Sequence, residues 1–298
     1  MMLELEGRAR FQRSARRTVV GIVAIAMGAA STAMAQQDDR WTVNFNGSGA
    51  SAAADAVATD AGGILVAVAV HGAETGKVVV KLGGKPVQAK LAGYDPVSRL
   101  CFFKVAEGEV SKPAVWLSSA PDRPGVVLKA GVHTGRTSGW IKRVGGKVLP
   151  LALLQVDFDK VSVAPGTPLV DEEGKIAAIV FQRADGHSVY AIPAEAVHRV
   201  RKDILQNGRL VRGWLGLSLR VDGDSPKIVR VLPNSPAEDA GMQEGDLISR
   251  IGDRKITSYP DVADAFFYVV PGEGVNVSIK RGSRDLDFTL MPTAEKAR

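Results

Sequence analysis

The most constraining feature of the sequence is a long series of short apolar segments, each ended within a few residues by glycine, proline or aspartate. Between about Trp41 and Val180 these segments include GILVAVAV, GKVVVKL, AVWLSS and GVVLKAGV. Segments of this length with turn-forming residues between them are typical of β-strands joined by short turns. A β-sandwich or β-barrel is therefore predicted for this part of the chain, rather than alternating strands and helices.

The stretch SVAPGTPLVDEEGKIAAIVF, residues 162–181, follows the same pattern at closer range. It predicts a loop, a strand, a tight turn at Glu173-Gly174 and a second apolar strand.

A helical pattern first appears at AEAVHRVRKDILQNG, residues 194–208. Val197, Val200 and Ile204 share one face, and Gly208 is placed to end the helix. A helix that closes a β-rich region marks a predicted domain boundary. The rest of the chain predicts a second, α+β unit, in which strands surround two short helices at AEDAG and PDVADAFF.

The N-terminus predicts export. Five arginines precede the apolar run TVVGIVAIAMGAASTAMA, which ends in Ala33-Met34-Ala35. A basic segment, a short apolar run and a small-x-small exit indicate a signal peptide cleaved after Ala35. The alternative, a membrane anchor, needs about 20 strongly apolar residues. The mature protein is expected in the periplasm or outside the cell, and the Arg16-Arg17 pair leaves the general and twin-arginine routes open.

Charge and cysteine content narrow the partners. Residues 1–35 contribute a net +3 of the chain's +6, which leaves a mildly basic mature protein without a long Lys/Arg block. No nucleic-acid partner is predicted. Cys101, the single cysteine, lies in an apolar run and is expected to be a buried thiol. His133, His187 and His198 are scattered without metal-ligand spacing, so no metal and no cofactor are predicted.

Three pieces of the C-terminal unit resemble a PDZ domain of the type found in HtrA/Deg proteases: GWLGL, NSPAEDAGMQEGDLISRIGDRKI and VSIKRG. The resemblance implies that a peptide adds as a strand beside the one that follows GWLGL, with its terminal carboxylate facing backbone N–H groups. The peptide-binding residues that the resemblance implies are Trp214, Leu215, Gly216, Leu217, Ser218, Leu219, Val262, Ala265 and Phe266. For Val262, Ala265 and Phe266, the alternative is that they simply form the core-facing stripe of their helix.

The N-terminal unit resembles the trypsin-like domain of the same family, through GYDPVSRLCFFKV, SGWIKR, LQVDFD, PGTPLVDEEGKIAAI and YAIPAEAV. The expected fold is mainly β: a trypsin-like double β-barrel followed by an α+β PDZ domain. The expected division is a signal peptide at 1–35, a degenerate protease domain at 36–208, a PDZ domain at 209–293 and a tail at 294–298.

Aligned on these motifs, the catalytic positions hold the wrong residue types. Arg99 stands where the family has its carboxylate, and an arginine cannot accept a hydrogen bond. Pro165 stands at the nucleophile's position and lacks the N–H that would also serve the oxyanion. The histidine position holds Ala69, Val70 or His71, depending on where a gap is placed. Relics of the catalytic site could survive at His71 and Ser162.

The resemblance and these substitutions predict an exported pseudoprotease without catalytic residues. It would bind peptide C-termini or extended segments of envelope proteins as an adaptor, a holdase or a modulator of an active protease homologue. A homo-trimer that uses Trp41 and Phe45 is expected by analogy. The alternatives are a serine endopeptidase in which Ser162 and His71 meet, and a metal-binding pseudoprotease.

Overall fold

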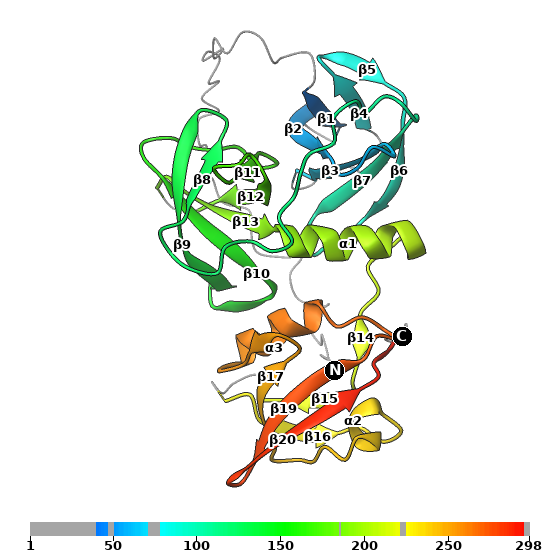
Figure 1. Cartoon of the computed structure of the whole chain (residues 1–298), viewed down its shortest axis with the longest axis vertical. Helices are drawn as coiled ribbons and strands as arrows, with labels where there is room; N and C mark the ends of the chain where they lie inside the picture. Colours follow the sequence, from blue (N-terminus) through cyan, green and yellow to red (C-terminus); the bar gives the residue numbers. More distant parts are fainter. Residues whose placement is uncertain (1–39, 47–50, 71–77, 185, 221–224, 295–298) are drawn as a thin grey trace, which may run out of the picture.

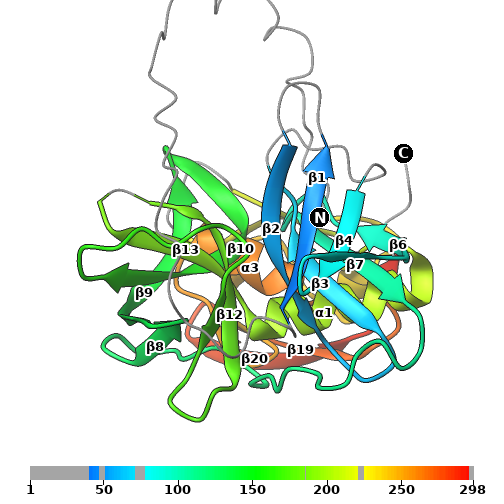
Figure 2. The same ribbon diagram turned by 90° about the horizontal axis from the view of Figure 1, so that it is seen from above.

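The computed structural model describes residues 40–46, 51–70, 78–184, 186–220 and 225–294. They form two β-sheets side by side and a smaller C-terminal unit below them (Figures 1 and 2). The predicted signal peptide and His71 lie outside these residues. In the described part of the chain, no helix is long and apolar enough to cross a membrane.

The first sheet has seven antiparallel strands in the order β5-β4-β1-β2-β3-β7-β6. Both faces of β7 are buried: Cys101 and Phe103 face the core of this sheet, while Leu100 and Phe102 face the interior shared with the rest of the domain. Successive side chains of a strand point to opposite faces, so neighbouring residues of β7 belong to different cores. The strands are β1 (Trp41–Asn46), β2 (Ser51–Ala58), β3 (Ile64–Val68), β4 (Val78–Leu82), β5 (Lys85–Val87), β6 (Ala89–Tyr94) and β7 (Leu100–Val105).

The second sheet closes into a barrel in the order β10-β13-β12-β11-β8-β9. The predicted loop, strand, turn and strand within residues 162–181 are confirmed, with Gly174 at a positive φ of 80° in the turn between β11 and β12. The strands are β8 (Val127–Ala130), β9 (His133–Val144), β10 (Lys147–Phe158), β11 (Pro168–Val170), β12 (Ile176–Arg183) and β13 (Ser188–Pro193).

The segment AVWLSS, expected to be a strand, is not one. It lies in the connection between the two sheets and makes a single parallel bridge, Trp116 to Ile176. Leu117 N–H donates to the Ile176 carbonyl at 2.9 Å, and the pairing does not extend further. Ala114, Trp116 and Leu117 pack against the hydrophobic clusters of the domain without joining the ladder of the barrel, whereas Val115 is 61% exposed.

Helix α1 (Ala194–Asn207) packs on β6, β7, β12 and β13 and so spans both sheets. Val197, Val200 and Ile204 are buried, as their spacing predicts. Gly208 ends the helix at a φ of 69°, with its N–H donating to the Ile204 carbonyl at 2.8 Å. The predicted helix and its glycine stop are confirmed.

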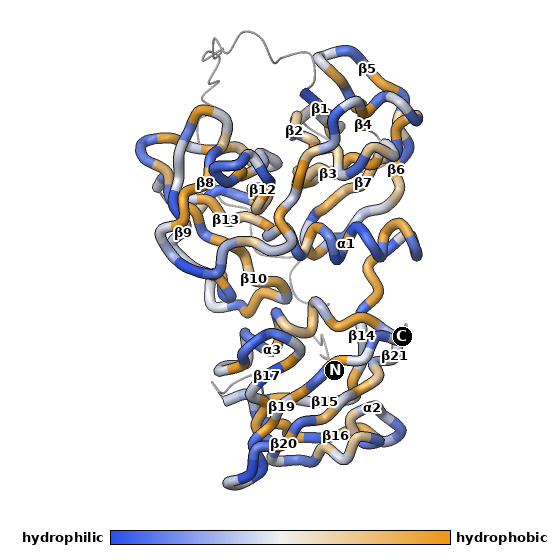
Figure 3. The backbone as a smooth tube through the Cα atoms, viewed as in Figure 1, coloured by the Kyte–Doolittle hydropathy of each residue, from blue (hydrophilic) through white to orange (hydrophobic). Residues whose placement is uncertain are grey.

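The C-terminal unit consists of two pairs of strands, a four-stranded sheet in the order β18-β17-β19-β20, and two short helices at the predicted places. Hydrophobic residues run along β7 and β13 above it, whereas the turn between β19 and β20 is hydrophilic (Figure 3). The elements are β14 (Gly213–Trp214), β15 (Leu217–Leu219), β16 (Ile228–Val231), α2 (Pro236–Asp239), β17 (Leu247–Ile251), β18 (Arg254–Lys255), α3 (Tyr259–Phe267), β19 (Val275–Arg281), β20 (Arg284–Leu290) and β21 (Thr293–Ala294), which pairs with β14.

Two expectations about single residues are decided by burial. Cys101 is fully buried and free, and burial raises the pKa of its thiol to about 12, as expected of a structural cysteine. Trp41 and Phe45 are 7% and 1% exposed in the core of the first sheet. Their rings already pack within the chain, so the expectation that they form the contact between copies is wrong.

Gly93 in β6 provides a test of how α1 is seated. A Cβ at this position would lie 2.8 Å from two carbons of Ile204 and 2.8 Å from the Gly208 carbonyl oxygen. We expect Gly93→Ala to lower the free energy of unfolding by about 1–3 kcal/mol, because it overpacks the contact between α1 and the sheet. Urea unfolding followed by tryptophan fluorescence measures the change.

Gly274→Ala is the matched control, since its nearest neighbour would be the flexible Met291 sulfur at 3.3 Å. Equal unfolding midpoints for the two variants would contradict this account of the helix seat.

Candidate functional site

Arg99 occupies the turn that leads into β7, at the position assigned from sequence to the missing carboxylate. Its backbone adopts a left-handed conformation with a φ of 58°, which is uncommon for a residue with a side chain. Asp95 shapes this turn by accepting hydrogen bonds from the Ser98 N–H at 2.9 Å and the Ser98 hydroxyl at 2.6 Å. The turn directs the Arg99 side chain toward the barrel.

The Arg99 guanidinium links the two sheets. Its Nη2 donates to the Phe181 carbonyl of β12 at 2.7 Å, and its central carbon lies 3.8 Å from the centre of the Phe181 ring. Its Nε is buried without a partner among the described residues, and burial lowers the pKa of the group. The Arg99 side chain donates and stacks, and it offers no acceptor to orient an imidazole.

Backbone pairing brings Ala69 and Arg99 together. The Ala69 N–H donates to the Arg99 carbonyl at 2.8 Å, and the Ala69 side chain is only 3% exposed. Val70, the second candidate for the histidine position, is partly buried and lies two residues after the end of β3. The third candidate, His71, lies outside the described residues.

The loop around Pro165 is closed onto the barrel by its backbone. Gly166 N–H donates to the Val180 carbonyl at 2.7 Å, and Val180 N–H donates to the Thr167 carbonyl at 2.9 Å. Val163 is buried in the barrel core, whereas Ser162 is exposed. Gly166 has a φ of 89° and lies close to β2, so the loop turns sharply where it meets the first sheet.

Ser162 faces a cleft of about 770 Å³ between the sheets, which His133 also lines. Among the described residues, no serine hydroxyl hydrogen bonds to a histidine ring. The His198 ring instead bonds to the backbone, with its Nε2 at 2.9 Å from the Leu117 carbonyl oxygen. Within the same residues, no group of three His, Cys, Asp or Glu side chains could hold a metal ion. Ser162 therefore stands without an activating base in the described part of the chain.

The loop before β15 is built around Gly216. It has a φ of 78°, and a Cβ would fall 2.1 Å from the Ser235 Cβ, so a glycine is required here. The Gly216 carbonyl accepts from Leu232 N–H at 2.8 Å, and the Leu215 carbonyl accepts from Ala237 N–H at 3.0 Å. These bonds fix the loop by its carbonyl groups.

The edge of β15 opposite β16 has no strand partner among the described residues. Leu217 pairs with Val231, and the flanking bond from Leu232 to Gly216 marks this as a non-hydrogen-bonded pair. In such a pair, the N–H and C=O of Leu217 point away from β16. The same holds for Leu219, since Arg220 N–H donates to the Lys227 carbonyl at 3.5 Å. Two residues of β15 therefore offer backbone groups at an open edge.

Helix α3 carries the other predicted peptide-binding residues. Val262, Ala265 and Phe266 are 0%, 2% and 9% exposed, and they belong to one hydrophobic cluster with Leu217 and Leu219. The structure thus brings the two predicted walls of the groove together. Ser218 points away from this cluster, and Trp214 lies partly buried in β14.

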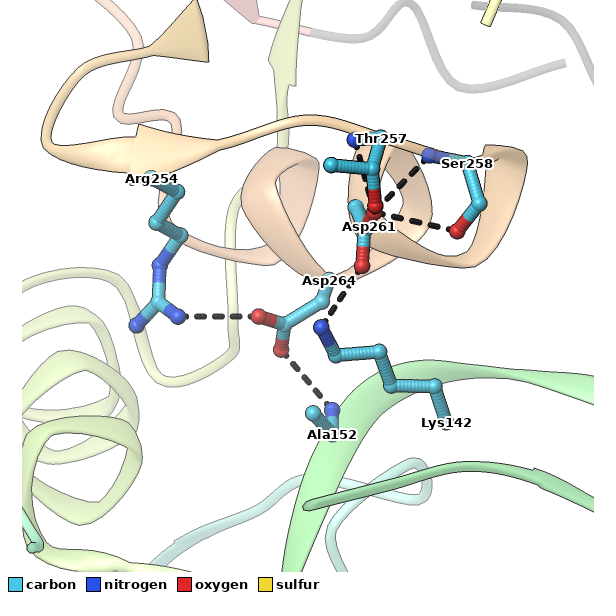
Figure 4. A network of polar contacts seen from close by, with 7 residues as sticks. All are labelled: Lys142, Ala152, Arg254, Thr257, Ser258, Asp261 and Asp264. Carbon is cyan, nitrogen blue, oxygen red and sulfur yellow. Dashed lines mark hydrogen bonds and ion pairs between the residues drawn. The ribbon is translucent and has the colours of Figure 1, made fainter. Parts of the chain in front are cut away.

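The opposite face of α3 is docked on the barrel (Figure 4). Asp264 accepts from the Ala152 N–H of β10 at 2.8 Å and pairs with Arg254 at 2.8 Å. Lys142 of β9 reaches Asp261 with its Nζ at 2.6 Å. At the end of α3, Phe267 packs into the cluster beneath the sheets. The helix is therefore shared between the C-terminal unit and the barrel.

Asp261 also caps its own helix. Its carboxylate accepts from the N–H groups of Thr257 and Ser258, both at 2.8 Å. Burial alone would raise the pKa of Asp261, but the hydrogen bonds from Lys142 and Thr257 outweigh it and hold the pKa well below its usual value.

A second clamp holds the connection after α1. Arg199 is 7% exposed, pairs with Asp203 at 2.5 Å and donates to the Val211 carbonyl at 2.8 Å. Asp203 accepts from the Val211 N–H at 2.7 Å. Gly213 N–H then donates to the Val269 carbonyl at 3.1 Å. The short linker is thereby bonded both to α1 and to the end of α3.

Comparison with known proteins identifies both parts. Residues 213–291 match the PDZ domain family. Over 71–75% of its length, the chain is 25% identical to serine protease HTRA1 of Xenopus tropicalis, 24% to the putative serine protease HhoB of Synechocystis and 28% to a probable periplasmic serine endoprotease DegP-like of Ectopseudomonas mendocina. Over most of its length, the chain is thus similar to HtrA/Deg serine proteases, and it carries a PDZ domain. It spans 54%, 61% and 50% of the length of these three relatives.

Solved structures of the family share the fold. The HtrA-type protease AlgW with a tripeptide superposes with a TM-score of 0.63 at 20% identity, covering 88% of this chain and 95% of AlgW. The serine endoprotease from Yersinia pestis gives a TM-score of 0.55 at 20% identity, with 87% and 95% covered. The predicted fold, trypsin-like sheets followed by a PDZ domain, is confirmed.

The sequence motifs of the HtrA/Deg family did not reveal how the PDZ domain is docked. Lys142 meets Asp261 and Ala152 meets Asp264, each pair across more than a hundred residues of chain, and no local pattern links them. The one available signal was the Ser258–Asp261 capping box, which predicts the start of α3 and not its contact with the barrel.

The depressed pKa of Asp261 makes the docking dependent on pH. Since the pKa is lower in the folded state, the stability that the charge contributes is present above about pH 4 and is lost as the pH falls through the folded pKa. We expect Asp261→Asn to lower the free energy of unfolding at pH 7 by about 1–3 kcal/mol, since it removes a charge-assisted hydrogen-bond network.

Urea unfolding at pH 7 and at pH 3 measures the free energy of unfolding of the wild type and of the variant. The difference in this free energy between the two proteins should be smaller at pH 3 than at pH 7. A difference that is unchanged between the two pH values would contradict the role assigned to the carboxylate. Asp285→Asn, at an exposed position of β20, is the control.

Proposed function

We propose that this HtrA/Deg family protein is an exported pseudoprotease that captures peptides through its PDZ domain. The observation that carries the proposal is the open edge of β15, where backbone groups of Leu217 and Leu219 face outward beside α3. An extended peptide can complete the hydrogen bonds of such an edge, and its terminal side chain can pack against Phe266. AlgW, a relative in fold, has been solved with a tripeptide and with a decapeptide.

We propose that the protein does not cleave peptides, because the side chains at the assigned catalytic positions are of the wrong types. Arg99 donates to the Phe181 carbonyl and stacks on its ring, an arrangement that supports a bridging role between the sheets. Pro165 supplies neither a hydroxyl nor an N–H to a substrate carbonyl. Acyl transfer would lack its nucleophile, an acceptor for the imidazole and one oxyanion donor.

The proposed cellular compartment rests on the predicted signal peptide and on the names of the relatives. The predicted cleavage after Ala35 would deliver the chain to the periplasm or outside the cell. The DegP-like relatives are named as periplasmic endoproteases, in keeping with the same compartment. The captured segments would belong to envelope proteins, with this chain as adaptor, holdase or modulator of an active homologue. A homo-trimer, which the family resemblance implies, would form through contacts other than Trp41 and Phe45.

The second candidate is a serine endopeptidase with a rearranged site. Its support is the names of the relatives and the position of Ser162 on the cleft between the sheets. His71 would have to reach Ser162 for this activity, because the serine needs a base to take its proton.

A labelling experiment separates the pseudoprotease from the endopeptidase. We expect the purified mature protein to leave casein intact and to remain unlabelled by a fluorophosphonate probe. Both reactions need a serine activated by a neighbouring base, and the proposed pseudoprotease has none. Mass spectrometry of the treated protein measures the labelling, with an active trypsin-like protease as the positive control. Stoichiometric labelling at Ser162 would establish the endopeptidase instead.

A binding experiment tests peptide capture. A peptide with an apolar C-terminal residue should bind the mature chain, and amidation of its terminus should weaken binding about ten- to a hundredfold, because the backbone donors at Leu215 to Leu217 lose a charged acceptor. Phe266→Glu should weaken binding too, by placing a carboxylate beside that of the ligand. Calorimetry measures both changes.

Lys255→Ala, an exposed change on β18, serves as the control variant and should leave the affinity unchanged. Equal affinity for the free-acid and amidated peptides would rule out carboxylate capture.

A further inference from the structure

The β15–β16 pair has an outer face that carries positive charge. Leu217, Leu219 and Ile228 point into the PDZ core, so the alternating residues point outward. Ser218 lies directly across from Arg230, and both are on the outer face. Next along the pair, Arg220 and Lys227 are joined by a backbone hydrogen bond. All three basic residues are exposed.

A bound peptide would extend this face by one strand. With its carboxylate at residues 215–217, the peptide runs antiparallel to β15 and exchanges bonds with Leu217 and Leu219. Its penultimate residue then lies opposite Ser218, with its side chain on the same face. Strands lie about 4.8 Å apart, so Arg230 starts about 10 Å from the penultimate residue, a gap that two long side chains reaching toward each other across Ser218 can close.

We propose that the PDZ groove selects C-terminal peptides with aspartate or glutamate at the penultimate position, and that Arg230 reads this side chain. The proposal rests on the proposed peptide capture and names its ligand class. Arg230 is exposed, and its side chain makes no ion pair or hydrogen bond with the other described residues. Its guanidinium can meet a carboxylate with two parallel hydrogen bonds, and the Ser218 hydroxyl lies between them as a further donor.

The expected preference is modest, because exposed ion pairs contribute little in water. A glutamate at the penultimate position should improve affinity about two- to fivefold over glutamine. Salt should reduce the preference, since the Debye length falls to about 3 Å at 1 M ionic strength. An apolar or hydrogen-bonded preference would not respond to salt in this way.

The test uses the full mature chain and three fluorescein-labelled hexapeptides that end in Val-Glu-Leu, Val-Gln-Leu or Val-Lys-Leu. Fluorescence anisotropy measures their affinities at 0.05 M and 1 M NaCl. The wild type should bind the glutamate peptide most tightly and the lysine peptide least tightly. Arg230→Gln should remove the ranking, and Arg230→Glu should reverse it.

Lys255→Gln is the matched control: it removes one exposed positive charge on β18, in the other sheet of the PDZ domain, and should keep the ranking. Arg230→Lys keeps the charge, and a reduced preference in the wild-type order supports the proposal. Three equal affinities in the wild type, or an unchanged ranking in Arg230→Glu, would overturn it while leaving peptide capture intact. Failure of all three peptides to bind would overturn the proposed capture itself and this specificity with it.

Discussion

The arrangement of this molecule depends on the docking of α3 against the barrel. One face of this short helix lies in the PDZ core, and the other is bonded to β9 and β10 through Asp261 and Asp264. A nine-residue helix is too short to be stable by itself, so both contacts are needed to hold it. The bond from Ala152 N–H is directional as well as charge-assisted, and it fixes the helix in register with β10. One wall of the proposed peptide groove is therefore held by the trypsin-like domain.

A rigid wall has consequences for binding. Peptide capture by strand addition costs the entropy of ordering the ligand, and a groove that is already positioned adds little further cost. The second clamp, from Arg199 and Asp203 to the linker, acts in the same direction. Arg199 and Asp203 are both nearly buried, and removal of either would leave a charge without its partner in a region of low dielectric constant. The two clamps together make the PDZ domain a fixed part of the molecule.

Arg99 has a comparable role between the two sheets. A half-buried guanidinium is costly unless its donors and its flat face are used. Here one donor meets the Phe181 carbonyl and the face lies on the Phe181 ring, although Nε has no partner among the described residues. Under the pseudoprotease proposal, an arginine that bridges the two sheets stands where the family has its catalytic carboxylate.

Local patterns in the sequence determined much of the fold. The apolar run around Cys101, the helical spacing of Val197, Val200 and Ile204, and Gly208 at the helix end all predicted what the structure has, because each acts through neighbours in the chain. The segment AVWLSS was misread as a strand, because an apolar run that covers a barrel has the same composition as one that joins it.

Only the tertiary structure decided where α3 is held, what the Arg99 side chain contacts and how Trp41 and Phe45 are buried. Each of these depends on residues far apart in the chain: Lys142 and Asp261 are 119 positions apart, and Arg99 and Phe181 are 82. A charged or aromatic side chain has many partners available in sequence, and packing selects one of them. The residue types, periods and turns were therefore readable from the chain alone, whereas the pairings that join its two domains were set by the way the sheets and the helix close on one another.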